Sequence, residues 1–473
     1  MDRNTLEKAM SHISGQHIAD AAKIKRRRPH WVAITAAATA AAILALVLLQ
    51  TALPKPTFSI ASNTARIAAS LRNVNSPLRA DYETEDAFQS ALESHLSLQK
   101  ARRAQKDNAL DGLASFFTEG SAVFLSGEEN TLWSPVSAYM SLASLAELSS
   151  GRSQRQILRL LGVNNTNTLR KQVAAVFEST YADKGKDVSK LATSLWFQEG
   201  ISYQDDKIDA LVRDHYASVY SGVLGSAETQ QAITAWVNEN TGGLLSDYPP
   251  SQLTSDAVFA LYSTIYFQSQ WKDDFDAKLN ISDIFHSPTG DRTVTYMRNA
   301  ARMTYYRGDN FGAICLPLEN GSNMWFILPD KSATSQDVLS RGQYIDMVLS
   351  QDWENKQTVI AHLTIPKFDV VEKKSLKDGL MQLGVTDIFS AEKANFSALR
   401  SALPAFAGTI EQASRVQIDE EGVTGASYTE INYMGSVPPS NTPDIIDFVL
   451  DRPFLFVVEK DNIPLFAGVV NEP

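Results

Sequence analysis

The stretch that most constrains the fold is Asp419–Pro439, DEEGVTGASYTEINYMGSVPP, because it joins two segments that read as strands. It follows Arg415–Ile418 and precedes Phe448–Lys460, an apolar run rich in β-branched and aromatic residues. A connection of this length between strands is usually functional or disordered. No proline interrupts Gly422–Val437, and proline is the residue that a central strand excludes.

The side chains after Gly422 alternate in a way that suits a strand with one buried and one exposed face. One set is small or apolar, and the other carries the bulk and the charge. The two sets are Val423, Gly425, Ser427, Thr429 and Ile431 against Thr424, Ala426, Tyr428 and Glu430. The stretch is therefore compatible with a surface loop and with a strand inside a sheet, and its own residues leave both open.

The composition fits a large globular domain that binds no nucleic acid. The chain has 473 residues, of which 44% are hydrophobic, enough for a large core in one to three domains. Its formal net charge of -11 argues against a nucleic-acid partner. Cys315 is the one cysteine, so no intrachain disulfide forms, and its apolar surroundings predict a buried small hydrophobe. An exported domain without disulfides suits a bacterial surface protein.

The amino-terminal part predicts a membrane anchor. Residues 31–53 contain no charged side chain and are long enough to cross a lipid bilayer. The basic run Lys23–Arg28 precedes them, so residues 1–30 are expected to be a cytoplasmic basic tail and the rest to lie outside the cell membrane. A cleaved signal peptide is the alternative, although the apolar core is long and no A-x-A site follows it.

Two further segments separate this transmembrane signal-anchor from the main domain. Residues 54–82 are poor in large apolar side chains and predict a tether. Residues 83–106 show helical spacing of apolar residues and predict an additional helix or stalk.

The sequence shows no pattern typical of an enzyme. It contains no G-x-S-x-G, H-E-x-x-H or G-x-x-x-x-G-K motif, and its seven histidines lack ligand spacing. We therefore expect no catalytic residue, no metal site and no cofactor.

Several blocks of sequence between Asn130 and Pro473 resemble blocks of the serpin family and occur in the same order as in that family. The first block matches N-x-F-x-S-P-x-S and G-x-T-x-x-Q-I-x-x-x-L at Asn130, Ser134, Pro135, Ser137, Gly151, Gln156, Ile157 and Leu161. The later blocks are Leu191–Gln198, Ile233–Leu245, Phe259–Phe275, Met324–Asp330, Ile365–Phe368, Leu380–Phe389, Ala394–Ser397, Glu420–Gly422, Asp451–Phe456 and Leu465–Pro473. The resemblance covers roughly residues 107–473 and implies an α+β serpin domain. Large mixed β-sheets, eight or nine surrounding helices and an exposed reactive-centre loop are then expected.

The same resemblance implies the functional positions. The hinge would be Glu420, Glu421, Gly422, Val423, Thr424, Gly425, Ala426 and Ser427, and the breach would contain Trp271. The shutter, under the gap where sheet A opens, would be Ser134, Ser137, Ser263 and Gln412. Ser263 stands where the family has asparagine, and Gln412 where it has histidine, so we expect a polar but rewired shutter.

Serpins are suicide inhibitors of serine proteases, whose cut loop inserts into sheet A before the acyl ester is hydrolysed. The resemblance places the reactive bond at Ser436–Val437, with Tyr433, Met434 and Gly435 as alternatives. No lysine or arginine occurs from Val416 to Asp451, so a trypsin-like enzyme has nothing to cut there. The predicted targets are elastase-like or subtilisin-like serine proteases. A non-inhibitory serpin that serves as a surface binding module is the alternative.

Overall fold

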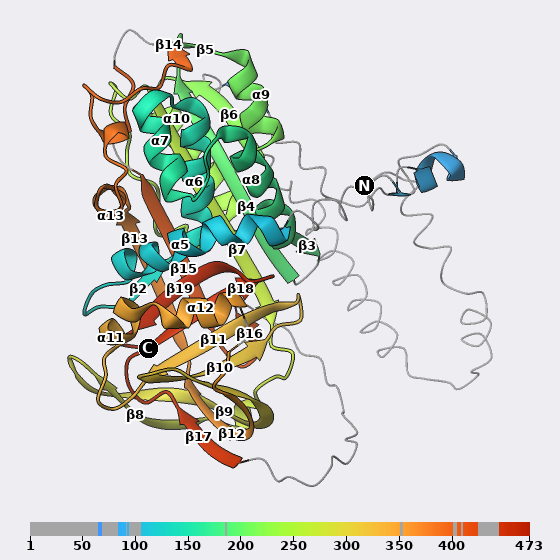
Figure 1. Ribbon diagram of the computed structural model, residues 1–473, viewed down its shortest axis with the longest axis vertical. Coiled ribbons are helices and arrows are strands. Elements are labelled where there is room, and N and C mark those ends of the chain that lie inside the picture. Colours follow the sequence, from blue (N-terminus) through green and yellow to red (C-terminus); the bar gives the residue numbers. More distant parts are fainter. Residues whose placement is uncertain are drawn as a thin grey trace, which may run out of the picture. The chain divides into compact units, whose positions relative to one another are not determined.

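Two large β-sheets and the helices around them make up the part of the chain that the structure describes (Figure 1). The computed structural model describes residues 65–68, 84–90, 92–93, 106–184, 187–350, 353–400, 404–407, 410–423 and 444–473. These residues belong to one compact unit, Ile60–Pro473.

The first sheet, called sheet A below, is 8-stranded and mixed, with the order β1-β6-β4-β7-β16-β15-β13 and β3 paired to β4. Its strands are β1 (Ala65–Ala68), β3 (Ala182–Lys184), β4 (Asp187–Gln198), β6 (Ala217–Gly222), β7 (Phe259–Gln270), β13 (Phe368–Ser375), β15 (Glu411–Ile418) and β16 (Gly422–Val423). Among the described residues, β7 and β15 pair with β16 and not with each other. Sheet A is therefore joined across its middle by two residues only.

The second sheet is 9-stranded, in the order β17-β12-β9-β10-β11-β18-β19-β2, with β8 paired to β9. Its strands are β2 (Thr131–Trp133), β8 (Ile281–Ser287), β9 (Gly290–Arg307), β10 (Phe311–Pro317), β11 (Ser322–Pro329), β12 (Lys356–Pro366), β17 (Asp444–Val449), β18 (Phe454–Lys460) and β19 (Ile463–Val470). Every residue of β19 is buried, because the apolar run at the carboxyl end lies in the middle of the core. A short pair, β5 (Ser202–Tyr203) and β14 (Leu399–Arg400), lies apart from both sheets.

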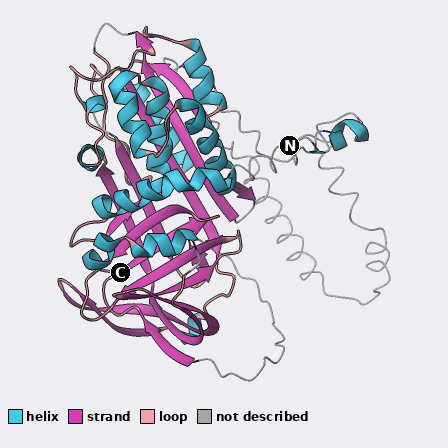
Figure 2. Ribbon diagram, viewed as in Figure 1, coloured by secondary structure: helices cyan, strands magenta, loops and turns pink. Residues whose placement is uncertain are grey.

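Most helices lie beside sheet A, in the upper half of Figure 2, whereas strands of the second sheet make up most of the lower half. The helices are α5 (Lys106–Phe124), α6 (Pro135–Leu148), α7 (Gly151–Leu160), α8 (Thr166–Thr180), α9 (Asp205–Arg213), α10 (Ala227–Asn240), α11 (Ser335–Arg341), α12 (Gln343–Ser350) and α13 (Lys377–Gln382). Two 3₁₀ turns, Ala277–Leu279 and Asp387–Phe389, also lie in the described part of the chain. The mixed sheets and surrounding helices confirm the predicted α+β class.

Helix α6 fixes the position of the polar residues at the centre of the molecule. The Ser134 side chain accepts a hydrogen bond from the Ser137 backbone N–H, and Pro135 occupies the first turn, where a backbone N–H is not needed. All of its residues are buried, because it packs between β7 on one side and β19 on the other.

Helix α10 covers the opposite face of sheet A. It packs on β7 and β4, and the turn that follows it brings Gly242 against the Tyr266 ring, where an added Cβ would lie 2.8 Å from that ring. Odd-numbered residues of β7 face the core instead, as the contact between Phe267 and Phe466 shows. The two faces of sheet A therefore follow the period-2 rule for strands.

The amino-terminal segments fall only partly within the described residues. Ala65–Ala68, inside the predicted tether, form β1 and pair antiparallel with β6, so this segment contains a strand that sequence analysis did not predict. Residues 85–90 are helical, within the predicted additional helix. No helix in the described ranges is long and apolar enough to cross a membrane, and residues 1–30 and 31–53 lie outside those ranges.

Candidate functional site

The hinge enters sheet A between β15 and β7. Val423 pairs with Ile418 of β15 and with Ser269 of β7, and its side chain is only 2% exposed. Gly422 pairs with Gln270 at the start of the same path. Val423 belongs to the set of side chains that alternation predicted to face inward. It is the one residue of that set that the structure describes, and it is buried.

Glycine is needed at position 422 because the backbone passes very close to β7. A Cβ added there would lie 2.3 Å from the Ser269 carbonyl oxygen and 2.7 Å from the Gln270 Cα. Real Cβ contacts are not that short, and backbone atoms on both sides cannot move aside easily. Any larger residue would push the hinge out of the sheet.

Trp271 lies where the hinge enters the sheet, at the breach. Its backbone N–H donates to the Glu421 carbonyl oxygen at 3.0 Å, and its indole Nε1–H donates to the Asp419 carbonyl oxygen at 2.8 Å. The Phe275 backbone N–H donates to the Glu420 carbonyl oxygen at 3.2 Å. The segment that follows β7 therefore holds three consecutive carbonyls, those of Asp419 and of the hinge residues Glu420 and Glu421.

The Glu420 side chain adds an ionic clamp. Its carboxylate lies 2.5 Å from the Lys367 Nζ and also accepts a hydrogen bond from Asn280. Burial alone would raise the pKa of Glu420, but the hydrogen bonds from Lys367 and Asn280 outweigh it and hold the pKa below its usual range. The carboxylate is thus ionised at neutral pH and ties the hinge to Lys367, which lies between β12 and β13.

The four predicted shutter residues form two polar pairs under sheet A. The Ser134 backbone N–H donates to Gln412 Oε1 at 2.8 Å, and Gln412 Nε2 donates back to the Ser134 carbonyl oxygen at 2.9 Å. The Ser137 hydroxyl donates to Ser263 Oγ and to its carbonyl oxygen, both at 3.2 Å. Gln412 thus contacts the start of α6 from β15, and Ser263 contacts it from β7.

The shutter hydroxyls have no base for nucleophilic catalysis among these contacts. The Ser134 hydroxyl donates to the Leu465 carbonyl oxygen at 2.7 Å, and the Ser137 partners are the oxygens of Ser263. Neither serine contacts a histidine or a carboxylate there. Within the described ranges, no group of histidine, cysteine and acidic side chains is arranged to hold a metal ion.

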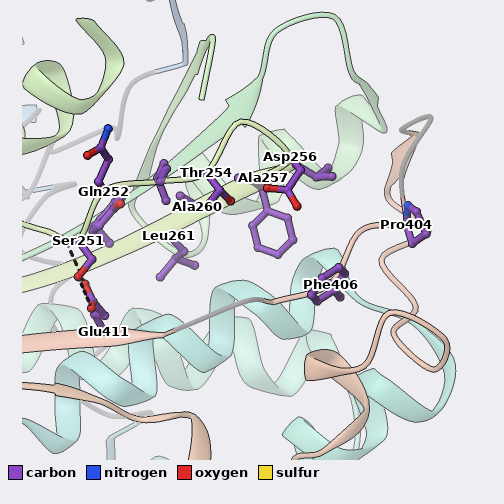
Figure 3. Close-up of a pocket in the computed structure, with 14 residues that line it drawn as sticks. Ser251, Gln252, Thr254, Asp256, Ala257, Ala260, Leu261, Pro404, Phe406 and Glu411 are labelled. Atoms are coloured by element: carbon purple, nitrogen blue, oxygen red, sulfur yellow. Dashed lines mark hydrogen bonds between the residues drawn. The ribbon is translucent and has the colours of Figure 1, made fainter. Parts of the chain in front are cut away.

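A second contact, which sequence analysis missed, lies at the start of β15, far from the hinge (Figure 3). Glu411, the first residue of β15, accepts hydrogen bonds from the Ser251 hydroxyl at 2.6 Å and the Ser251 backbone N–H at 3.1 Å. Lys373 donates to the Ser251 hydroxyl at 3.1 Å and to the Pro249 carbonyl oxygen at 2.8 Å. We call Ser251, Lys373 and Glu411 the basal clasp.

A cavity of about 240 Å³ lies beside the basal clasp, bounded by residues 251–262, Pro404, Phe406 and Glu411 (Figure 3). The clasp joins the segment after α10 to β15 and β13. No sequence signal indicated it, because its three residues come from separate parts of the chain.

A buried ion cluster, also missed by sequence analysis, ties α6 to α8 and α9. The Glu147 carboxylate is fully buried and lies 2.6 Å from Arg170 and 2.8 Å from Lys207. His215, also fully buried, places its Nε2 3.4 Å from the same carboxylate. Burial would raise the pKa of Glu147, but the nearby His215 ring and the hydrogen bonds from Arg170 and Lys207 prevail and lower it far below its usual value.

The remaining predicted site residues cannot be placed. Hinge residues Thr424, Gly425, Ala426 and Ser427 lie outside the described residues, as do Tyr433, Met434, Gly435, Ser436 and Val437 of the predicted reactive bond. The described hinge, breach and shutter residues do come together around the gap in sheet A.

Comparison with known proteins points to one family. The family model described as "Serpin (serine protease inhibitor)" matches residues 121–473. Alaserpin of Manduca sexta is 26% identical over 394 residues, which cover 81% of this chain and 97% of alaserpin. A protein of Cyanea capillata named "Serine protease inhibitor" is 26% identical over 377 residues, which cover 76% of this chain and 96% of that protein.

Solved structures show the same fold. The thermophilic serpin Tengpin in its native state superposes with a TM-score of 0.69 at 23% identity, covering 76% of this chain and 93% of Tengpin. Arabidopsis AtSerpin1, in its native stressed conformation, gives a TM-score of 0.66 at 23% identity, and the match covers 79% of this chain and 98% of the AtSerpin1 chain.

Proposed function

This chain belongs to the serpin family, and we propose that it traps serine proteases as a suicide substrate, by cleavage of its reactive loop and insertion of that loop into sheet A. Protease inhibitors of this family are not enzymes. The observation that carries the proposal is the position of the hinge. Val423 is already seated between β15 and β7, and those strands pair with it rather than with each other.

Extending this register supports insertion of the following residues. Counting on from Val423, Gly425 would lie between Val416 and Phe267, both buried. Ser427 would then lie beside Ser414, whose buried hydroxyl has no hydrogen-bond partner among the described residues. A serine arriving there would satisfy it.

The next inward residue in the same register is Thr429, which would lie between Gln412 and Ser263. Its hydroxyl would enter the polar pairs of the shutter, where a hydrogen-bonding group is needed. Glu430 would follow on the outer face, opposite Glu411 of the basal clasp. Insertion beyond this point requires the basal clasp to open.

The target class follows from the loop residues, which we propose to be cut at Ser436–Val437. Serine before the cut suits an elastase-like pocket, whereas cleavage after Tyr433 or Met434 would suit chymotrypsin-like or subtilisin-like enzymes. The absence of lysine and arginine from Val416 to Asp451 disfavours trypsin-like enzymes.

We also propose that this serpin is a bacterial, membrane-anchored member with its inhibitory domain outside the cell. Residues 31–53 supply an uncharged apolar segment, and the basic residues before it favour a cytoplasmic amino terminus. Recovery of a mature chain that begins beyond Leu53 would contradict the anchor.

Incubation of the detergent-solubilised chain with pancreatic elastase, subtilisin and trypsin, followed by denaturing gels, tests the inhibitory function. We expect an SDS-stable complex with elastase or subtilisin and none with trypsin. The mass of the released carboxyl-terminal fragment identifies the cut bond. Clean cleavage without a complex would support the non-inhibitory binding module instead.

A further inference from the structure

A second cavity, of about 210 Å³, lies beside the breach and has no role in the proposed trapping reaction. It lies between the segment after β7 and strands β9, β10 and β12. Its principal walls are Trp271, Phe275, Met303, Cys315, Leu316 and Leu363. Sequence analysis predicted a buried Cys315, but the residue is half-buried in the structure and lines this cavity.

The walls suit an aromatic ring. Trp271 and Phe275 are 2% and 5% exposed, and their rings meet edge to face at 5.9 Å between centroids. An engineered apolar cavity of about 150 Å³ in another protein binds benzene, so about 210 Å³ accommodates one ring or two fused rings.

The polar lining excludes an ionic ligand. Asp273 and Arg302 both border the cavity and both are exposed, so their opposite charges leave no net charge to recruit an ion. Asn299 is the one half-buried polar side chain besides Cys315 in the lining, and its Oδ1 already accepts from the Ala300 backbone N–H at 2.7 Å. Its amide N–H groups remain for a ligand carbonyl or hydroxyl. The lining therefore fits an uncharged molecule with at most one acceptor.

We propose that this cavity binds a neutral aromatic molecule of one or two rings and that the bound molecule holds the hinge in place. The two rings that would pack on the ligand belong to the residues whose backbone N–H groups hold the hinge carbonyls. Trp271 donates to Glu421 and Asp419, and Phe275 donates to Glu420. A ligand that restrains both residues stabilises the hinge in its present position.

The consequence for insertion follows from linkage. Insertion in the proposed register keeps Val423 in place but requires β7 and β15, which are in contact, to move apart beyond it, so a ligand that restrains the segment following β7 against the hinge slows insertion. Hinge displacement would in turn weaken ligand binding by the same factor. This second part rests on the proposed trapping reaction, whereas the binding site itself does not.

Cys315 provides a direct test of the binding site because it is the only cysteine in the chain. The full-length protein in detergent is treated with methyl methanethiosulfonate, a small neutral thiol reagent, with and without indole as the probe. Burial, with a contribution from nearby Glu459, raises the pKa of the Cys315 thiol, so its modification is slow enough to follow by mass spectrometry. At ten times its Kd, indole should slow modification about tenfold and raise the melting temperature. Indole-3-acetate, which carries a buried charge if bound, should do neither.

A cavity-filling variant with a matched control separates this site from others. Ala301 lines the cavity, and its neighbour Ala300 is exposed on the other face of β9. Ala301→Leu should abolish both effects of indole, and Ala300→Leu should keep them. Thermal unfolding of each variant without probe reports whether it is folded. If Ala301→Leu fails to fold, Ala301→Gly replaces it in the test. The glycine variant enlarges the cavity and should still bind indole.

Two results would overturn the proposal. If millimolar indole neither protects Cys315 nor raises the melting temperature, the proposed binding site is refuted. If the two leucine variants respond equally to indole, indole binds outside this cavity. Neither measurement involves a protease, so both stand even if trapping fails. Where an elastase complex forms, saturating indole should slow its appearance several-fold, and an unchanged rate would overturn the coupling to the hinge.

Discussion

Replacing Val423 by arginine should convert the trapping reaction into simple turnover. The valine side chain is 2% exposed between Ile418 and Ser269, so an arginine there would have to bury a guanidinium group against a methyl-rich strand and a hydroxyl. Desolvating an unpaired ion costs several kcal/mol in a protein interior. We take about 3 kcal/mol as a lower figure, because the long side chain can partly reach solvent.

The outcome follows from a race between loop insertion and hydrolysis of the acyl ester. A barrier increase of about 3 kcal/mol slows insertion roughly 150-fold, since each 1.36 kcal/mol is a factor of ten in rate. Hydrolysis is unaffected and becomes the faster branch. The number of inhibitor molecules consumed per protease trapped should therefore rise by about two orders of magnitude.

The assay is titration of elastase or subtilisin with the V423R protein, read both as residual protease activity and as the ratio of complex to cleaved inhibitor on denaturing gels. Thr424→Arg is the matched control, because alternation directs the next side chain to the outer face. It should leave trapping nearly unchanged, whereas Gly425→Arg should behave like V423R. Efficient trapping by V423R would refute insertion as the mechanism, and equal loss in both Val423 and Thr424 variants would refute the register.

Three further changes test contacts that the structure identified. Glu411→Gln weakens the basal clasp, so it should speed loop insertion and lower the free energy of unfolding by about 1 kcal/mol. Ser251→Ala should act in the same direction. Stopped-flow trapping rates that fall in both variants would contradict a restraining role of the clasp. Glu147→Gln removes the buried carboxylate that Arg170 and Lys207 share and should lower the free energy of unfolding by about 2–3 kcal/mol in denaturant titrations, because both cations are partly exposed. Because the folded pKa of Glu147 lies below its usual 4.5, its contribution is complete above about pH 4.5 and is lost as the pH falls further, so the wild-type advantage over the variant should shrink in acid. Glu420→Gln should cost only about 1 kcal/mol, since Lys367 is partly exposed and water screens the pair, but amide hydrogen exchange at Trp271 and Phe275 should accelerate; unchanged exchange would separate the ionic clamp from the hinge.

The sequence predicted much of this arrangement because its signals are local. Alternation between Gly422 and Ile431 put Val423 among the residues of one face, and Val423 is buried in the structure. The run after Phe448 predicted core strands, which β18 and β19 confirm. Periodicity of this kind depends only on how side chains project from one strand or helix, so neighbouring residues suffice to establish it.

Other features arise from residues that only folding brings together. Asn280 and Glu420 are 140 positions apart and Ser251 and Glu411 are 160 apart, yet each pair is in hydrogen-bond contact. Cys315 illustrates the same limit, because its apolar neighbours in sequence gave no sign of the cavity that Trp271 and Phe275 form beside it.

The sequence by itself therefore determined which segments form the core, and it predicted which face of the loop can enter a sheet and which protease class the loop disfavours. All three depend on side-chain chemistry and on periodicity along a short stretch. Only the tertiary structure decided how the hinge is held, where the gap in sheet A is closed and what fits beside the breach. These depend on the distances between strands and loops from distant parts of the chain, which are set when the two sheets pack around α6.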